Sequence, residues 1–173
     1  MRTFADNWDR TETLAVGMEL LPLLIPLGVW ALMPAFRRKG ESILHLFAFF
    51  ALVHVLYRAY CQVFKGMELA VAFGWPESPF LMELGAVYAA AAAALGAAIA
   101  LQRTEWVKGI LIALALYFAL SAAFHLFDAF ALENLRLAHV GPRLWHDILF
   151  VVVCFWVIRK AEARGRPIYY VPR

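Results

Sequence analysis

Polar side chains follow helical spacing inside two of the long apolar runs of this sequence. Tyr117, Ser121, His125 and Asp128 are separated by four, four and three residues, so a helix would place them on one face. The second set consists of His54, Tyr57, Arg58 and Cys61. Because polar groups within apolar spans usually face the protein interior, we expect the two sets to face each other or a shared cavity.

Ionisable residues also recur near one end of several apolar runs. Glu19, Arg58, Glu83, His125 and Asp128 each lie within about two helical turns of a run's end. The topology argued below puts those ends on one side of a membrane. A charge in the middle of a bilayer costs roughly 2.5 to 3.5 kcal/mol on insertion scales. The sequence therefore predicts a polar pocket in the outer half of the membrane.

We expect this pocket to bind a lipophilic molecule, such as a quinone or a lipid, or a cation. Its predicted lining consists of Glu83, Arg58, His125, Asp128, Glu19, Tyr57 and Tyr117. A divalent metal is a candidate cofactor, since carboxylate and imidazole groups suit zinc, iron or manganese. The candidate metal ligands are Glu83, His125, Asp128 and His146. Among these, only His125 and Asp128 are close in sequence.

The residues alone leave three alternatives open. His54 and His125 lie at comparable depth and would suit a haem, although the neighbouring acids and arginine disfavour it. A buried carboxylate beside a histidine also suits a membrane enzyme that moves protons on a lipophilic substrate, such as an isomerase or an oxidoreductase. The third alternative is structural: Arg58 forms an ion pair with Glu83 or Glu19, and Asp147 extends into the headgroup region.

The composition fixes the class of protein that must position these residues. Hydrophobic residues make up 64% of the 173 residues and the mean hydropathy is +0.69, which is too apolar for a soluble domain. Five apolar runs predict an all-α integral membrane bundle of five transmembrane helices, forming a single domain over residues 1–173. The predicted spans are 13–36, 42–64, 78–101, 106–131 and 144–158. The last is short, and becomes long enough if its helix begins near Arg143 and ends near Arg159.

The basic residues predict the orientation. Ten Lys and Arg residues flank the side that holds segment 37–41, turn 102–108 and the C-terminal tail, against five on the opposite side. The positive-inside rule then puts the N-terminus outside and the C-terminus in the cytoplasm. We expect the protein to lie in the inner membrane of a bacterium. The formal net charge of +3 reflects this topology, and it does not indicate a nucleic-acid partner.

Local patterns predict three further features. The segment 65–77 contains a short apolar stretch typical of a helical turn in the membrane interface, followed by Ser78 as a cap and Pro79 as the first helical residue. Small residues recur every four positions in the following run, which predicts that this helix is central: Gly85, Ala89, Ala93 and Ala97. Cys61 and Cys154 should differ in depth by roughly 10 Å and remain free, buried thiols.

The second half of the chain resembles a known family. The resemblance rests on the stretch Gly74-Trp75-Pro76-Glu77-Ser78-Pro79-Phe80, followed by Glu83 and Gly85, His125 and Asp128, Asn134, Gly141-Pro142 and Asp147-Ile148-Leu149. Over about residues 74–160, this chain is similar to a family of small bacterial membrane proteins of uncharacterised activity. That family is in turn distantly similar to DoxX-type proteins. The resemblance implies an all-helical bundle and a polar motif at Glu83, His125 and Asp147. Where that family has Asn-x-Gly before the last helix, this chain has His139-Val140-Gly141.

These observations favour a binding or accessory subunit of the membrane, with an outer polar pocket, over the acid–base enzyme. Membrane lipids are the expected partners, together with a larger membrane complex or further copies of the chain. A transporter is less favoured, because the five runs show no internal symmetry.

Overall fold

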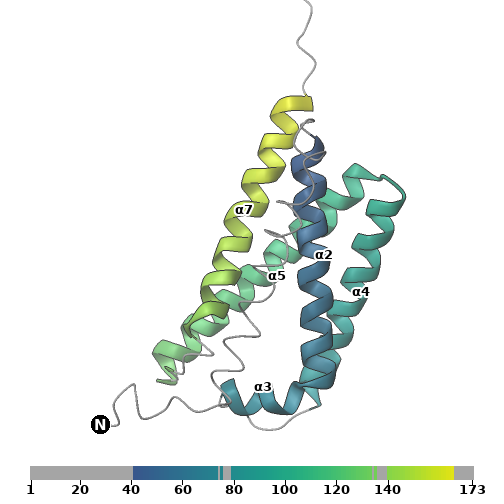
Figure 1. Cartoon of the computed structure of the whole chain (residues 1–173). Helices are drawn as coiled ribbons and strands as arrows, with labels where there is room; N and C mark the ends of the chain where they lie inside the picture. The colour runs from purple at the N-terminus through teal and green to yellow at the C-terminus, as the bar shows by residue number, and fades with distance from the viewer. Residues whose placement is uncertain (1–40, 74, 76–78, 134, 136–139, 166–173) are drawn as a thin grey trace, which may run out of the picture.

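The structure is a computed structural model, and it describes residues 41–165 except 74, 76–78, 134 and 136–139. Every regular element within this part of the chain is a helix. The predicted span 13–36, with Glu19, lies outside the described residues. The helices, labelled as in Figure 1, are α2 (Glu41–Phe64), α3 (Gly66–Phe73), α4 (Phe80–Ala100), α5 (Thr104–Ala131) and α7 (Pro142–Gly165).

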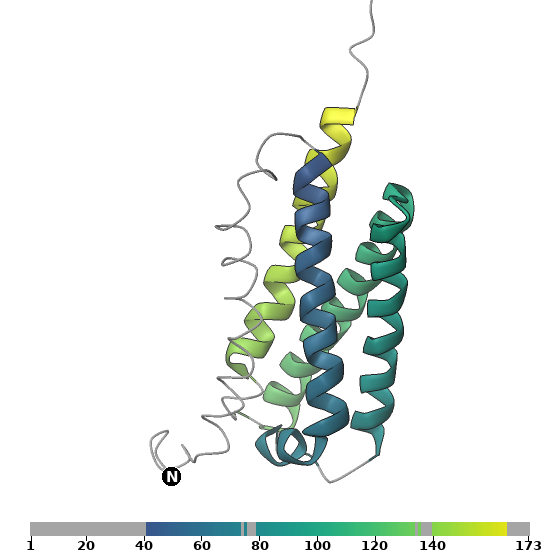
Figure 2. The same cartoon turned by 45° about the vertical axis from the view of Figure 1, so that its right-hand side comes forward.

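Four long helices form the bundle, and the short α3 lies across one end of it (Figure 1). Helix α2 packs along α4 on one side and contacts α7 on the other, and α5 packs along α7 (Figure 2). The end that holds α3 is also where α2 and α5 finish and where α4 and α7 begin. We call this the α3 end of the bundle.

Three of the described helices are long and apolar enough to cross a membrane: Ile43–Phe64, Phe80–Ala100 and Thr104–Ala131. The all-helical prediction is confirmed for the described residues, and the predicted runs 42–64, 78–101 and 106–131 match α2, α4 and α5 closely. The run 144–158 forms part of α7, which starts at Pro142, two residues before the predicted span and one before Arg143, and continues past Arg159 to Gly165. Proline suits a helix start because its missing N–H has no intrahelical partner there.

The prediction that the third run forms the central helix is wrong. Ala89, Ala93 and Ala97 are exposed, and of the small-residue series only Gly85 is buried. The buried face of α4 is instead set by larger side chains interleaved with small ones: Leu81, Gly85, Tyr88, Ala92, Leu95 and Ala98. In an alanine-rich helix the small residues surround the axis, so the few large apolar side chains decide which face packs. The helix that contacts every other described helix is α2.

The predicted turn after the second run is the helix α3, which begins one residue after Lys65. Leu69 and Ala70 of α3 are buried against Cys61 and Leu81, so the short helix is attached to α2 and α4 by apolar packing. Pro79 has helical dihedral angles, φ −62° and ψ −14°, and its carbonyl accepts hydrogen bonds from the N–H groups of Met82 and Glu83. Helix α4 itself begins at Phe80 with Pro79 as its N-cap residue, one position before the place in the helix that the sequence predicted for this proline. Ser78 lies outside the described residues.

Candidate functional site

A layer of buried polar side chains joins three helices near the α3 end of the bundle. We call it the interhelical cluster, and its members are His54 and Arg58 of α2, His125 and Asp128 of α5, and Arg143, His146 and Asp147 of α7. None of these residues is more than 5% exposed. Two arginines and two aspartates give the cluster no net formal charge when its histidines are neutral.

Arg58 connects two members of the cluster. Its Nε donates a hydrogen bond to Nε2 of His54, one turn earlier on the same helix, at 3.3 Å. Its Nη2 lies 3.7 Å from Oδ1 of Asp147 on α7. Since Nε2 of His54 accepts a hydrogen bond, we assign the ring proton of the neutral imidazole to Nδ1. That Nδ1 atom is buried and has no hydrogen-bond partner among the described residues.

Asp147 is fully buried beside a histidine. Its Oδ1 lies 3.2 Å from Nδ1 of His146, the preceding residue. The ring of His146 stacks on the ring of His54 with centroids 4.1 Å apart, so α2 and α7 meet through two imidazoles. The Ser121 side chain of α5 lies beside the carboxylate. The second oxygen, Oδ2, is buried and has no hydrogen-bond partner within the described part of the chain.

Arg143 connects the start of α7 to α5. Its Nε donates a hydrogen bond of 3.0 Å to Nε2 of His125, and both side chains are buried. Trp75, in the segment after α3, stacks on the His125 ring with centroids 6.3 Å apart and planes 9° apart. One turn further along α5, Asp128 is also buried. The stripe predicted on α5 therefore faces inward where it lies closest to the α3 end.

Aromatic rings lie against the cluster. Phe118 lies 5.7 Å from the ring of His54 and 5.8 Å from that of His146, measured between centroids. Phe50 stacks on His54 at 6.5 Å, and Tyr88 stacks on Phe118 at 6.4 Å. This aromatic layer connects the polar cluster with the apolar core around Phe118.

Four of the predicted site residues belong to the cluster: Arg58, His125, Asp128 and His146. Tyr117 is half-buried and makes edge contacts with Tyr88 and Phe118, and Tyr57 packs against the small apolar group that includes Cys61. Glu83 is different, because it is exposed in the first turn of α4. Glu19 lies outside the described residues.

The predicted metal site is not assembled by the residues that were predicted to form it. No three His, Cys, Asp or Glu side chains among the described residues are grouped so that they hold a metal ion. Glu83 is exposed at the start of α4, and Nε2 of His125 accepts from a guanidinium group. The haem alternative meets a similar obstacle, since Nε2 of His54 and Nε2 of His125 both accept hydrogen bonds from arginines.

The sequence analysis did not predict Arg143 as a site residue, and it placed Asp147 only in the polar motif that the family resemblance implies. The spacing held a signal for both. Arg143, His146, Asp147, Phe150 and Cys154 follow one another at three, one, three and four residues, and all five are buried. Helical spacing therefore places Arg143 on the same face as the cysteine and the phenylalanine of the core. Both Cys61 and Cys154 are free and buried, as predicted.

Comparison with known proteins identifies one protein family. A family of unknown function, DUF6790, matches residues 13–167, which is most of the chain and extends well beyond the stretch of 74–160 that carried the resemblance. The expectation of a family without established activity is thus confirmed, whereas this match shows no similarity to DoxX-type proteins. A search of curated proteins and a search of solved structures each found no match.

Proposed function

We propose that this chain, which belongs to the DUF6790 family of unknown function, is an integral membrane protein that binds the polar head of a lipophilic molecule at the interhelical cluster. Quinones and lipids are the ligand classes concerned. The protein acts as a binding or accessory subunit of the membrane, either with partner proteins or as several copies. The observation that carries this proposal is a pair of buried polar atoms without partners among the described residues, Nδ1 of His54 and Oδ2 of Asp147.

These two atoms have complementary requirements. The assigned tautomer makes Nδ1 of His54 a donor, while Oδ2 of Asp147 is an acceptor. Leaving such a group buried and unsatisfied costs about 1 to 3 kcal/mol each. Both residues contact Arg58, so the two atoms belong to one locality of the bundle. A head group that carries a carbonyl and a hydroxyl would satisfy both, and its ring would pack against Phe118.

The same geometry favours a lipophilic molecule over a cation. Two guanidinium groups, those of Arg58 and Arg143, are buried within the cluster and would repel an added positive charge. Both arginines already neutralise the two aspartates in formal charge. A neutral head group with hydrogen-bonding oxygens fits this balance, because it needs no further counter-charge.

The proposal places the cluster in the outer half of a bacterial inner membrane, with five spans, an outer N-terminus and a cytoplasmic C-terminus. Arg143 is buried against His125 and so no longer counts as an outer loop charge, which strengthens the excess of basic residues on the opposite side. The α3 end is then the outer end of the bundle. α2, α4 and α5 supply the three helices that are apolar enough to cross.

One contact favours an acid–base enzyme as a second candidate. Oδ1 of Asp147 lies 3.2 Å from Nδ1 of His146, so the carboxylate would orient the ring and leave Nε2 to exchange a proton with a substrate. On this hypothesis the bound lipophilic molecule is chemically changed. Replacement of His146 by Gln would then abolish turnover while ligand binding persists.

Native mass spectrometry of the full chain in mild detergent tests the binding proposal. The probe is decylubiquinone kept in its reduced quinol form, whose hydroxyl groups can donate to Oδ2 of Asp147 and accept from Nδ1 of His54. It is added to delipidated protein, and the readouts are bound mass and thermal stabilisation. We expect Asp147→Asn and His54→Phe to weaken binding about tenfold each, the loss that one buried hydrogen bond to a ligand represents. Val157→Ala, a buried change in α7 away from the cluster, is the matched control and should bind as the parent does.

Two outcomes would overturn the proposal. One is that neither extracted lipophilic molecules nor decylubiquinone bind the parent protein. The other is that the two cluster variants and the Val157→Ala control bind the probe equally well. Incubation of the bound ligand with the parent and with His146→Gln, followed by chemical analysis of the ligand, separates a binding subunit from an enzyme.

A further inference from the structure

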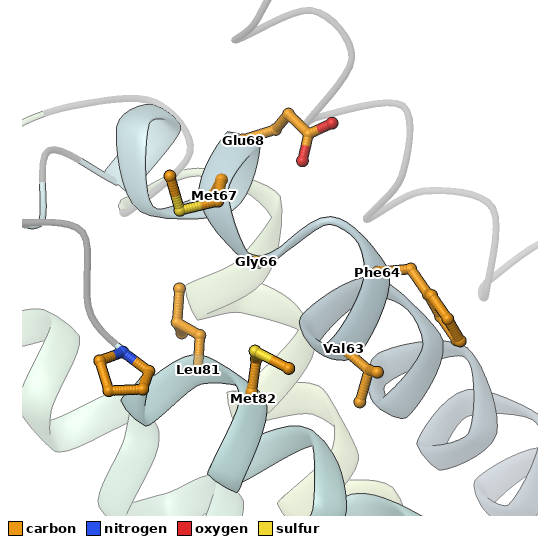
Figure 3. Close-up of a pocket in the computed structure, with 8 residues that line it drawn as sticks. Val63, Phe64, Gly66, Met67, Glu68, Leu81 and Met82 are labelled. Atoms are coloured by element: carbon orange, nitrogen blue, oxygen red, sulfur yellow. The ribbon is translucent and has the colours of Figure 1, made fainter.

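A second candidate binding site lies outside the interhelical cluster, between α3 and the adjoining ends of α2 and α4. It is a pocket of about 370 Å³, within the range of roughly 300 to 1,000 Å³ found for small-molecule sites. Figure 3 shows Met67, Leu81 and Met82 gathered around Gly66, with Val63 of α2 beside them. The lining residues are Val63, Phe64, Gly66, Met67, Glu68, Pro79, Leu81 and Met82.

The walls of this pocket are apolar and continuous with the outer surface of two candidate spans. Phe64, Met67 and Met82 are 69%, 55% and 56% exposed. Phe64 is the last residue of the span Ile43–Phe64, and Met82 lies in the first turn of the span Phe80–Ala100. In a membrane these side chains face hydrocarbon, so the pocket opens towards lipid tails and no aqueous path is needed to fill it.

A pair of opposite charges marks the rim. Lys65 follows directly after the span of α2 and is not itself a lining residue, but its Nζ donates a hydrogen bond of 2.9 Å to Oε1 of the lining residue Glu68. This hydrogen bond lowers the pKa of the Glu68 carboxyl and raises the pKa of the Lys65 amine, so both groups are charged at neutral pH. About half of each side chain is exposed.

The order of these groups along the membrane normal matches an amphipathic ligand. Hydrocarbon-facing walls come first, and the two charges follow at the end of the span, where the headgroup region begins. The Lys65 ammonium has three N–H donors and Glu68 takes one of them, which leaves capacity for a phosphate oxygen. The Glu68 carboxylate has a second oxygen for a cationic head group. The pair is therefore complementary to adjacent negative and positive charges on one ligand.

We propose that this pocket binds a zwitterionic phospholipid with a primary ammonium, a phosphatidylethanolamine. One acyl chain lies against Val63, Leu81 and Met82. The phosphate contacts Lys65, and the ammonium contacts Glu68. The site is separate from the interhelical cluster, and its occupancy does not depend on what the cluster binds.

The test uses the delipidated full chain and three probes: phosphatidylethanolamine, phosphatidylglycerol and diacylglycerol with the same acyl chains. Native mass spectrometry measures how much of each is bound. We expect phosphatidylethanolamine to bind most tightly. Lys65→Gln should weaken its binding about tenfold, the loss typical of one charge-assisted hydrogen bond. Glu68→Gln should remove the preference for phosphatidylethanolamine over phosphatidylglycerol, because only the ammonium contact is lost.

A groove-filling variant tests the place of the acyl chain. Met82→Trp should abolish binding of all three probes, whereas Leu116→Trp, an equally exposed change on α5 away from the pocket, should leave binding intact. Both positions are on the surface, so both variants should fold. Equal lipid binding by these two variants would overturn the proposal, as would an unchanged lipid preference in Glu68→Gln. Asp147→Asn serves to separate the two sites: it should weaken decylubiquinone binding and leave the phospholipid bound.

Discussion

Arg143 donates a hydrogen bond from Nε to Nε2 of His125 across the contact between α7 and α5, at 3.0 Å, with both side chains buried. The arginine is the second residue of α7, and the histidine lies near the end of α5. The bond therefore holds together two helices that are joined by the segment 132–141. It also fixes which nitrogen of His125 carries the proton, since the accepting Nε2 is deprotonated.

The first prediction concerns this bond. Arg143→Met removes the hydrogen bond to Nε2 of His125 and one of the two buried positive charges that balance the aspartates of the cluster, so we expect a large loss of stability, roughly 3 to 5 kcal/mol. His125→Phe alone should cost less. In a double-mutant cycle the two changes should deviate from additivity by roughly 0.5 to 3 kcal/mol. Equilibrium unfolding in mixed detergent micelles measures each value, and strict additivity would show that the pair is not coupled.

The second prediction concerns the ion pair between Arg58 and Asp147, whose atoms are 3.7 Å apart. Arg58→Met or Asp147→Leu alone leaves a buried charge without its counter-charge, which is expected to cost roughly 3 to 5 kcal/mol. The double variant removes both charges and should be more stable than either single variant. Thermal unfolding in detergent, followed by circular dichroism, measures the three midpoints. A double variant less stable than both single variants contradicts the pairing.

The third prediction uses two helical glycines with different surroundings. A Cβ atom at Gly85 would lie 2.7 Å from Cγ2 of Val63 and 3.2 Å from its backbone nitrogen, so Gly85→Ala must push α4 away from α2. Overpacking of this kind typically costs about 1 to 3 kcal/mol. At Gly109 a Cβ atom would meet nothing within 4 Å.

Gly109→Ala is therefore the matched control, and alanine's higher helix propensity should make it neutral or more stable by up to about 1 kcal/mol. Thermal midpoints of the two variants in the same detergent decide the matter. Thermal midpoints that shift in the same direction and by the same amount in both variants would contradict the close approach of α2 and α4 at Gly85.

The fourth prediction tests the proposed orientation. In a background carrying Cys61→Ala and Cys154→Ala, single cysteines are placed at Glu105, which is 81% exposed, and at Leu135, which is 64% exposed. These residues lie at opposite ends of α5. A membrane-impermeant maleimide should label Leu135→Cys in intact bacterial cells and Glu105→Cys only after permeabilisation. The reverse pattern would contradict an outer α3 end.

Helix positions in the described region were predictable because hydrophobic length alone sets them. The apolar runs at 42–64, 78–101 and 106–131 coincide with α2, α4 and α5 to within two residues. Burial was predictable where the polar residues of an apolar run lie on one helical face, because that face is then expected to point into the protein. His125 and Asp128 are examples. Burial was not predictable on α4, because the alanines surround that helix and only its packing partner α2 decides between faces.

The composition of the cluster was only partly predictable. The sequence places four acids near the ends of its apolar runs, Glu19, Glu83, Asp128 and Asp147, against one arginine within a run, Arg58. The structure places Glu83 at the surface and brings in Arg143, which removes the excess for the described residues. Arg143 precedes the predicted span 144–158 by one residue, and in the structure it lies within α7 and is buried. This difference of one residue changes the formal charge of the site.

The distance in sequence between Arg58 and Asp147 has a consequence for biogenesis. Arg58 emerges from the ribosome early, in α2, while its carboxylate partner belongs to α7, the last described helix to be made. Until α7 has been synthesised, the guanidinium group of Arg58 has no carboxylate of Asp147 beside it. The last described helix therefore completes the bundle electrostatically as well as by packing.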